Sequence, residues 1–119
     1  VVTKGWFNPV AFAVGTQDEF WIADRADNEE AENIAHVVKG KVLSDTNVPG
    51  INEPYSALLD GKKLYVCGAV SQELVRYSVG SGKANSREVI ADDCALGLAK
   101  LDNGSIAYSD QKTIRVFRP

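Results

Sequence analysis

A tight-turn hairpin motif recurs along the chain and constrains its fold more than any other feature. The clearest copy is residues 58–68, LLDGKKLYVCG, in which an Asp-Gly turn separates two apolar segments. Glycine tolerates the positive φ that a two-residue turn requires, so this pattern predicts a β-hairpin. Related segments lie at residues 11–24 and 98–110. The recurrence predicts an architecture of repeated antiparallel hairpins.

The spacing of the expected strands defines the length of the repeat. Second strands of the three units would begin at Phe20, Leu64 and Ile106, which are 44 and 42 residues apart. Four short strands in about 40–45 residues are typical of one blade of a β-propeller. The sequence therefore predicts a single all-β domain of propeller type with three four-stranded blade equivalents. These units are expected at residues 1–46, 47–91 and 92–119.

Three blades cannot close a ring, because natural propellers typically contain about four to eight. An open fan would leave apolar flanks and strand edges uncovered. A second copy of the chain would complete six blades with two-fold symmetry, with a strand at residues 1–4 of each copy finishing the last blade of the other. The alternative is that the missing blades lie on a different chain or on a removed part of this one. The sequence contains no methionine, which favours a processed product or an excerpt of a longer chain.

The order of these elements resembles NHL-type and gluconolactonase-like propeller repeats. The order is a proline, an apolar strand, an Asp-Gly-type turn and a second apolar strand that ends near an aspartate, and residues 53–68 and 20–24 match it best. The third copy retains the turn at residues 102–104 but has Ala95 in place of the proline. The resemblance covers nearly the whole chain. It implies an architecture more than an activity, because propellers host unrelated functions.

The loops before the three inner strands should share one rim of such a propeller, with Asn8, Glu53 and Cys94 at equivalent positions. In the gluconolactonase-like family, a Glu beside a Pro holds a divalent cation together with Asn and Asp residues. Glu53 is similar to that Glu. The resemblance implies that Asn8, with Asp92 or Asp93, supplies further oxygen ligands for calcium or another divalent cation. The matched Asn and Asp motifs of the family are missing, so a solvated set of turn residues is the alternative.

Two aromatic residues, Trp6 and Phe7, come just before the first inner strand. They are candidates for lining a pocket for a small molecule, glycan or peptide, since aromatic faces stack on such ligands. Packing between blades is the alternative for both. The candidate ligand-binding set is therefore Trp6, Phe7, Asn8, Glu53, Asp92 and Asp93. The candidate metal ligands within it are Glu53, Asn8 and Asp92.

The remaining residues that carry chemistry are expected to be structural. His36, the only histidine, lies among apolar residues and is expected to be a hydrogen-bonded structural side chain. No serine or cysteine has a recognisable histidine and acid companion, so the sequence does not predict a nucleophilic triad. Acidic residues after the second strand lack the spacing of a calcium loop and are expected to form a solvated hairpin tip. They are Asp24, Asp27, Glu29, Glu30 and Glu32.

Both cysteines fall on the same rim, where a disulfide between Cys67 and Cys94 is geometrically conceivable. Two free and partly buried thiols are nevertheless expected. Aromatic residues recur at nearly matching places on the second strands, and all three are expected to lie in the core between blades. They are Trp21, Tyr65 and Tyr108.

Charge and hydropathy narrow the classes of function. A net charge of −3 argues against nucleic acid and anionic membranes as partners, because both require a basic face. No apolar run approaches the roughly 20 residues of a membrane span, so a soluble protein is expected, with its compartment left open and an extracellular site allowed. The first hypothesis is a non-enzymatic binding module that presents its rim loops. The alternatives are a metal-dependent lactonase or esterase-type hydrolase and an incomplete propeller that only assembles.

Overall fold

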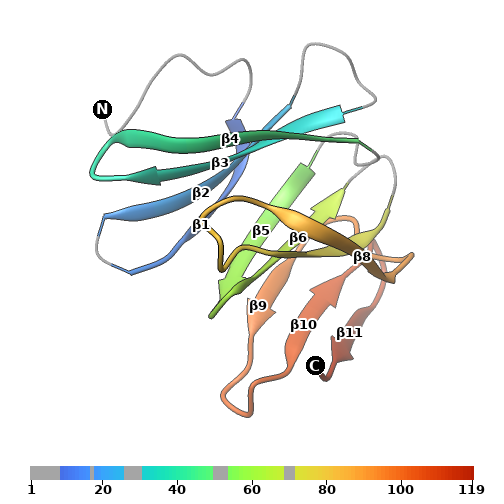
Figure 1. Cartoon of the computed structure of the whole chain (residues 1–119). Coiled ribbons are helices and arrows are strands. Elements are labelled where there is room, and N and C mark those ends of the chain that lie inside the picture. Colours follow the sequence, from blue (N-terminus) through green and yellow to red (C-terminus); the bar gives the residue numbers. More distant parts are fainter. Residues whose placement is uncertain (1–8, 17, 26–30, 50–53, 69–71) are drawn as a thin grey trace.

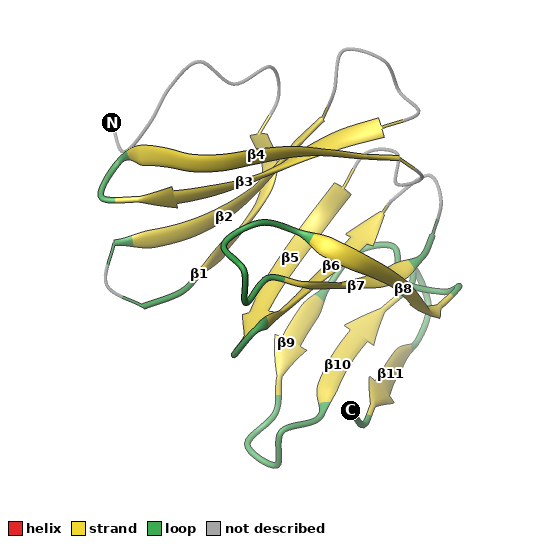
Figure 2. Ribbon diagram, viewed as in Figure 1, coloured by secondary structure: helices red, strands yellow, loops and turns green. Residues whose placement is uncertain are grey.

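The computed structural model describes residues 9–16, 18–25, 31–49, 54–68 and 72–119. In these residues the regular structure is all β, with 11 strands in three antiparallel sheets and no helix (Figures 1 and 2). The first sheet contains β1 (Pro9–Val14), β2 (Glu19–Arg25), β3 (Ala31–Val38) and β4 (Lys41–Pro49). The second contains β5 (Pro54–Asp60), β6 (Lys63–Gly68), β7 (Leu74–Ser78) and β8 (Asn85–Ala91). The third contains β9 (Leu98–Lys100), β10 (Ile106–Ser109) and β11 (Ile114–Phe117).

The predicted Asp-Gly hairpin is confirmed. Strand β5 pairs with β6 so that Asp60 lies opposite Lys63, and Gly61 between them has a φ of 59°. An L-residue with a side chain pays a steric cost in that conformation, which is why glycine is found there. The third hairpin also has a glycine with positive φ in its turn. This residue is Gly104, which lies between β9 and β10 and has a φ of 87°. The local chemistry of the turns therefore fixes which strands pair.

Each sheet runs through its strands in chain order, and the first strands of the three sheets are neighbours in space. Strand β1 lies against β5, and β5 lies against β9 (Figure 1). Consecutive sheets thus stack face to face along two seams. We call the side of a sheet that is turned toward the preceding sheet its rear face. The side turned toward the following sheet is its forward face.

Alternation along the second strands assigns residues to these two faces. Trp21 and Ala23 of the first sheet are buried in the first seam against Leu64 and Val66 of the second sheet. The forward side chains of the second sheet, Tyr65 among them, lie in the second seam. Successive side chains of a strand point to opposite faces. The two seams are therefore built in the same way, with forward residues of one sheet packed on rear residues of the next.

All three recurrent aromatic residues are buried, as the sequence predicts, but they do not occupy one equivalent position. Trp21 and Tyr65 point forward, whereas Tyr108 enters the second seam from the rear face of the third sheet. Because Tyr108 is in register with Ile22 rather than with Trp21, the forward position of the third sheet is held by Ala107. This shift of one residue removes the large forward side chain from the last sheet.

A polar side chain on the third strand packs on each forward aromatic ring. His36 lies opposite Trp21, with ring centroids 4.1 Å apart and planes at 9°. Arg76 lies opposite Tyr65, and its guanidinium carbon is 5.9 Å from the tyrosine ring centroid. In the third sheet the residue opposite Ala107 is Val116. The forward face of that sheet is accordingly more apolar at these positions than those of the first two.

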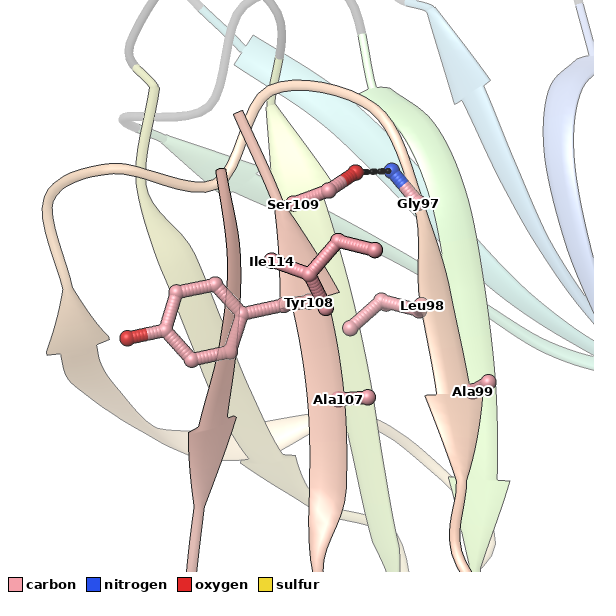
Figure 3. Close-up of a pocket in the computed structure, with 7 residues that line it drawn as sticks. All are labelled: Gly97, Leu98, Ala99, Ala107, Tyr108, Ser109 and Ile114. Atoms are coloured by element: carbon pink, nitrogen blue, oxygen red, sulfur yellow. Dashed lines mark hydrogen bonds between the residues drawn. The ribbon is translucent and has the colours of Figure 1, made fainter. Parts of the chain in front are cut away.

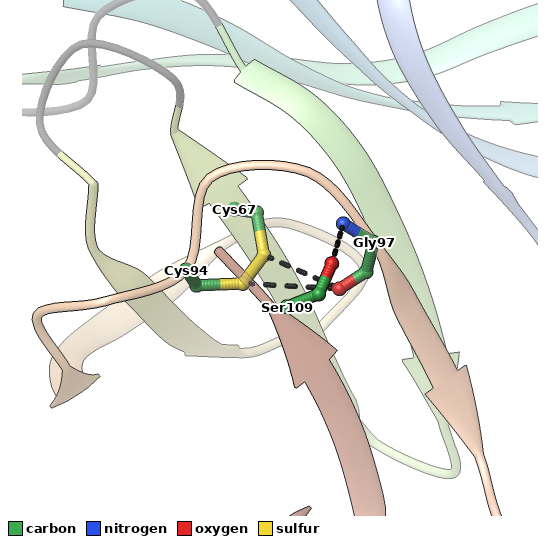
Figure 4. Close-up of a disulfide and its surroundings, with 4 residues drawn as sticks. All are labelled: Cys67, Cys94, Gly97 and Ser109. Atoms are coloured by element: carbon green, nitrogen blue, oxygen red, sulfur yellow. Dashed lines mark hydrogen bonds between the residues drawn. A yellow bond between two sulfur atoms is a disulfide. The ribbon is translucent and has the colours of Figure 1, made fainter. Parts of the chain in front are cut away.

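The expectation of free thiols is wrong, because Cys67 and Cys94 form a disulfide. Their Cα atoms are 5.4 Å apart, and both sulfurs lie 4.0 Å from the carbonyl oxygen of Gly97 (Figure 4). The amide of Cys94 also donates to the carbonyl of Gln72, with an N–O distance of 3.0 Å. The disulfide joins the end of β6 to the segment before β9. It therefore ties the third sheet to the second.

The three sheets do not close into a ring. In the described residues, β11 pairs with β10 alone, whereas its counterparts β3 and β7 each have an outer neighbour, β4 and β8. The strand expected at residues 1–4 lies outside the described residues. What the structure establishes is a stack of three antiparallel sheets with two buried seams.

Candidate functional site

The forward face of the third sheet is an apolar surface without a facing sheet in the described part of the chain. Ala99, Ala107 and Val116 lie in one cross-strand row, and Ser109 pairs with Ile114 beside them. The side chain of Ile114 is 80% exposed and that of Val116 is 50% exposed. Exposure of large apolar side chains on a contiguous sheet face is typical of an interaction surface.

This face is hollowed by its small residues. A shallow pocket of about 240 Å³ lies over β9 and β10 (Figure 3). Its floor is fixed by the Gly97 amide, which donates to the Ser109 hydroxyl oxygen at 3.0 Å. The residues that line it are Gly97, Leu98, Ala99, Ala107, Tyr108, Ser109 and Ile114. The hollow is suited to an apolar side chain from outside the sheet.

The rear face of the first sheet also exposes large apolar side chains. Phe12 and Val14 of β1 are 60% and 62% exposed, and the Phe12 ring meets that of Phe20 edge-on at 6.2 Å. Farther across the same face Ile22 and Val37 are buried. The exposed apolar surface is thus confined to the β1 side, where large side chains project. The two ends of the stack thus both expose apolar side chains, with Phe12 and Val14 at one end and Ile114 and Val116 at the other.

Four of the six residues predicted to bind a ligand lie outside the described residues. They are Trp6, Phe7, Asn8 and Glu53, so their grouping at a rim stays a prediction. Asp92 is exposed, and Asp93 forms an ion pair with Arg115 of β11. Burial, followed by the negative charge of Asp93, raises the pKa of the Tyr108 hydroxyl. Asp93 is thereby engaged in holding β11 and Tyr108 together.

The divalent-metal hypothesis depends on three candidate ligands, Glu53, Asn8 and Asp92. In the part of the chain that the structure describes, no three His, Cys, Asp or Glu side chains are grouped as metal ligands would be. Two of the three candidate ligands, Glu53 and Asn8, fall outside that part. The hydrolase alternative built on them stays a prediction.

One of the acidic residues that the sequence predicts to be solvated at a hairpin tip is buried instead. Asp24 is buried at the end of β2 rather than solvated. Burial and the nearby Asp24 carboxylate together raise the pKa of Asp45 on β4. Asp27, Glu29 and Glu30 lie outside the described residues, and nothing is established about the side chain of Glu32.

His36 is a hydrogen-bonded and largely buried residue, as predicted, but the sequence does not reveal its partner. Its Nε2 donates to the Glu19 carboxylate at 2.7 Å. The other Glu19 oxygen accepts from the Thr16 amide at 3.2 Å. A Cβ at position 15 would lie 1.9 Å from that carboxylate, so Gly15 makes the space for it. The pairing follows from the β2–β3 register, in which Glu19 and His36 project from the same face.

Comparison with protein-family models found no match, and a search of curated proteins found no relative. The resemblance to NHL-type and gluconolactonase-like repeats therefore stays an expectation. In the residues that the structure describes, no helix is long and apolar enough to cross a membrane. A buried disulfide is characteristic of proteins in oxidising compartments.

Proposed function

We propose that the chain is an interaction module that assembles with a second copy of itself into a six-sheet β-propeller. The forward face of the third sheet of each copy packs on the rear face of the first sheet of the other. The observation that carries the proposal is the uncovered apolar face around Ala99, Ala107 and Ile114. Two such contacts related by a two-fold axis close the ring and leave no end face exposed.

A second copy fits this face because the same stacking rule already builds both seams. In the first seam the large forward residue Trp21 belongs to a buried cluster, and the small, partly buried rear residue Ala57 packs against that cluster. At the proposed contact the order of side-chain sizes is reversed. The small residue, Ala107, lies on the forward face of one copy, and the large residue, Phe12, lies on the rear face of the other. Each contact then pairs one aromatic residue with one alanine, and close packing in protein interiors requires large and small side chains to interdigitate in this way.

The assembled ring would present the rim loops as its ligand-binding surface. Its candidate residues are those of the sequence prediction: Trp6, Phe7, Asn8, Glu53, Asp92 and Asp93. A small molecule, glycan or peptide is the expected ligand class. The disulfide indicates an oxidising compartment, so the proposal includes an extracellular location.

The solution mass of the chain and of a charged variant tests the assembly. Two copies are expected to give twice the 12.9 kDa mass of one chain by light scattering. Ala99→Glu places a carboxylate on the exposed forward face, and burying an unpaired charge costs several kcal/mol. We expect this variant to dissociate at least about 100-fold more readily, which follows from tenfold per 1.4 kcal/mol.

Gln111→Glu is the matched control, since it adds the same charge at an exposed bend outside that face. The control should keep the mass of the natural chain. A natural chain of 12.9 kDa at every concentration, or equal masses for both variants, would contradict the proposal.

A further inference from the structure

The Glu19–His36 pair has the arrangement of an oriented general base. The Nε2–H of His36 is held by a carboxylate at 2.7 Å, and stacking on Trp21 fixes the plane of the ring. Because the carboxylate accepts the Nε2 proton, Nδ1 of the neutral ring carries a lone pair. That Nδ1 is buried and has no hydrogen-bond partner in the described residues. A carboxylate that fixes the tautomer of a histidine is a recurrent way to direct its second nitrogen at a reacting group.

Ser44 is the hydroxyl-bearing residue that the sheet register places beside His36. It lies directly opposite His36 in the β3–β4 pairing, so both side chains project from one face. In the present arrangement its hydroxyl donates to the Gly82 carbonyl oxygen at 2.6 Å. The register therefore places a serine hydroxyl beside a histidine that is oriented by Glu19.

Both residues line one open pocket between the first sheet and the loop that follows β7. The pocket has a volume of about 350 Å³, which is large enough for a small ester. Leu43 provides an apolar wall, and Lys83 contributes an ammonium group able to stabilise an oxyanion. The remaining lining residues are Ser81 and Gly82.

We propose that Ser44 is a nucleophile for small carboxylic esters, with His36 as its base and Glu19 as a positioning residue. This activity lies beyond the assembly function. The Ser44 proton passes to Nδ1 while Oγ bonds to the ester carbonyl carbon. The C–O bond to the alcohol then breaks, and the alcohol leaves with the proton from His36. Water attacks the acyl-serine in the same manner, releases the acid and restores the hydroxyl.

An alkyl fluorophosphonate tests the nucleophile without knowledge of the natural ester. Oγ of Ser44 bonds to phosphorus, the P–F bond breaks and fluoride leaves, so intact-protein mass spectrometry should detect one adduct. Peptide mapping should place it on Ser44. His36→Gln should slow labelling about 100-fold or more, the usual contribution of a general base. Glu19→Gln should change the pH profile of the labelling rate, which a purely structural role would not do.

Ser44→Ala and Ser81→Ala form the matched pair, because both serines line the same pocket. Only Ser44→Ala should abolish the adduct. Both variants remove one hydroxyl, and equal melting temperatures would show that folding is retained. Absence of an adduct on the natural chain, or its persistence in Ser44→Ala, would overturn the proposal.

Discussion

Replacing both half-cystines, as Cys67→Ala with Cys94→Ala, is expected to lower the free energy of unfolding by about 3.5 kcal/mol. The disulfide closes a loop with a sequence separation of 27 residues, and the chain-entropy relation gives that value. The loss should be concentrated in the third sheet, because the bond joins β6 to the segment before β9. Urea unfolding followed by tryptophan fluorescence and by far-ultraviolet circular dichroism measures it.

Reducing agent provides the control for this prediction. Dithiothreitol should destabilise the natural chain by a similar amount and leave the double variant unchanged. A natural chain whose unfolding midpoint is the same with and without reductant would show that the bond does not form or does not stabilise the fold.

Tyr65→Ala is expected to cost about 3–5 kcal/mol of stability, the range for truncating a large buried aromatic residue. Tyr65 is 1% exposed and lies in the centre of the second seam. Its ring lies 6.3 Å from that of Phe117, and the Arg76 guanidinium packs near both rings. Truncation would therefore open a cavity and remove the aromatic partner of a largely buried cation.

Tyr55→Ala is the matched control, since Tyr55 is 53% exposed on neighbouring β5. The Tyr55→Ala substitution should change the free energy of unfolding by less than about 1 kcal/mol, as surface substitutions usually do. Equal losses for the two tyrosines would mean that the second seam is not packed as described.

The strands and their pairing could be predicted from the sequence because turn chemistry is local. The Asp60-Gly61 turn fixes β5 and β6, and the short continuous apolar run of β6 indicates a strand that is buried on both faces. The repeat length then assigns the remaining hairpins. Whether these sheets form a propeller is not decided locally, because closure depends on faces and edges that belong to other copies or chains.

The misjudged residues are those whose state depends on contacts between sheets. Free thiols were expected at Cys67 and Cys94, but the second seam brings their Cα atoms to 5.4 Å. The near match of Tyr108 to Trp21 and Tyr65 does not reveal that Tyr108 lies on the opposite face, because a strand of four residues gives too little alternation to fix its register. No sequence pattern links Glu19 to His36 or His36 to Ser44. Their contacts follow from the registers of β2, β3 and β4.

In the proposed six-sheet ring, the two ends of the three-sheet stack pack on each other between copies. Hydroxyl-radical footprinting of the natural chain tests this packing by measuring the oxidation of Phe12 and Ile114. These residues are 60% and 80% exposed in a single copy. Both residues should be protected at concentrations where the mass is doubled and should become reactive on dilution. Tyr55, at 53% exposure, should react at all concentrations. If Phe12 and Ile114 react strongly at every concentration, this result would contradict the proposed packing between copies.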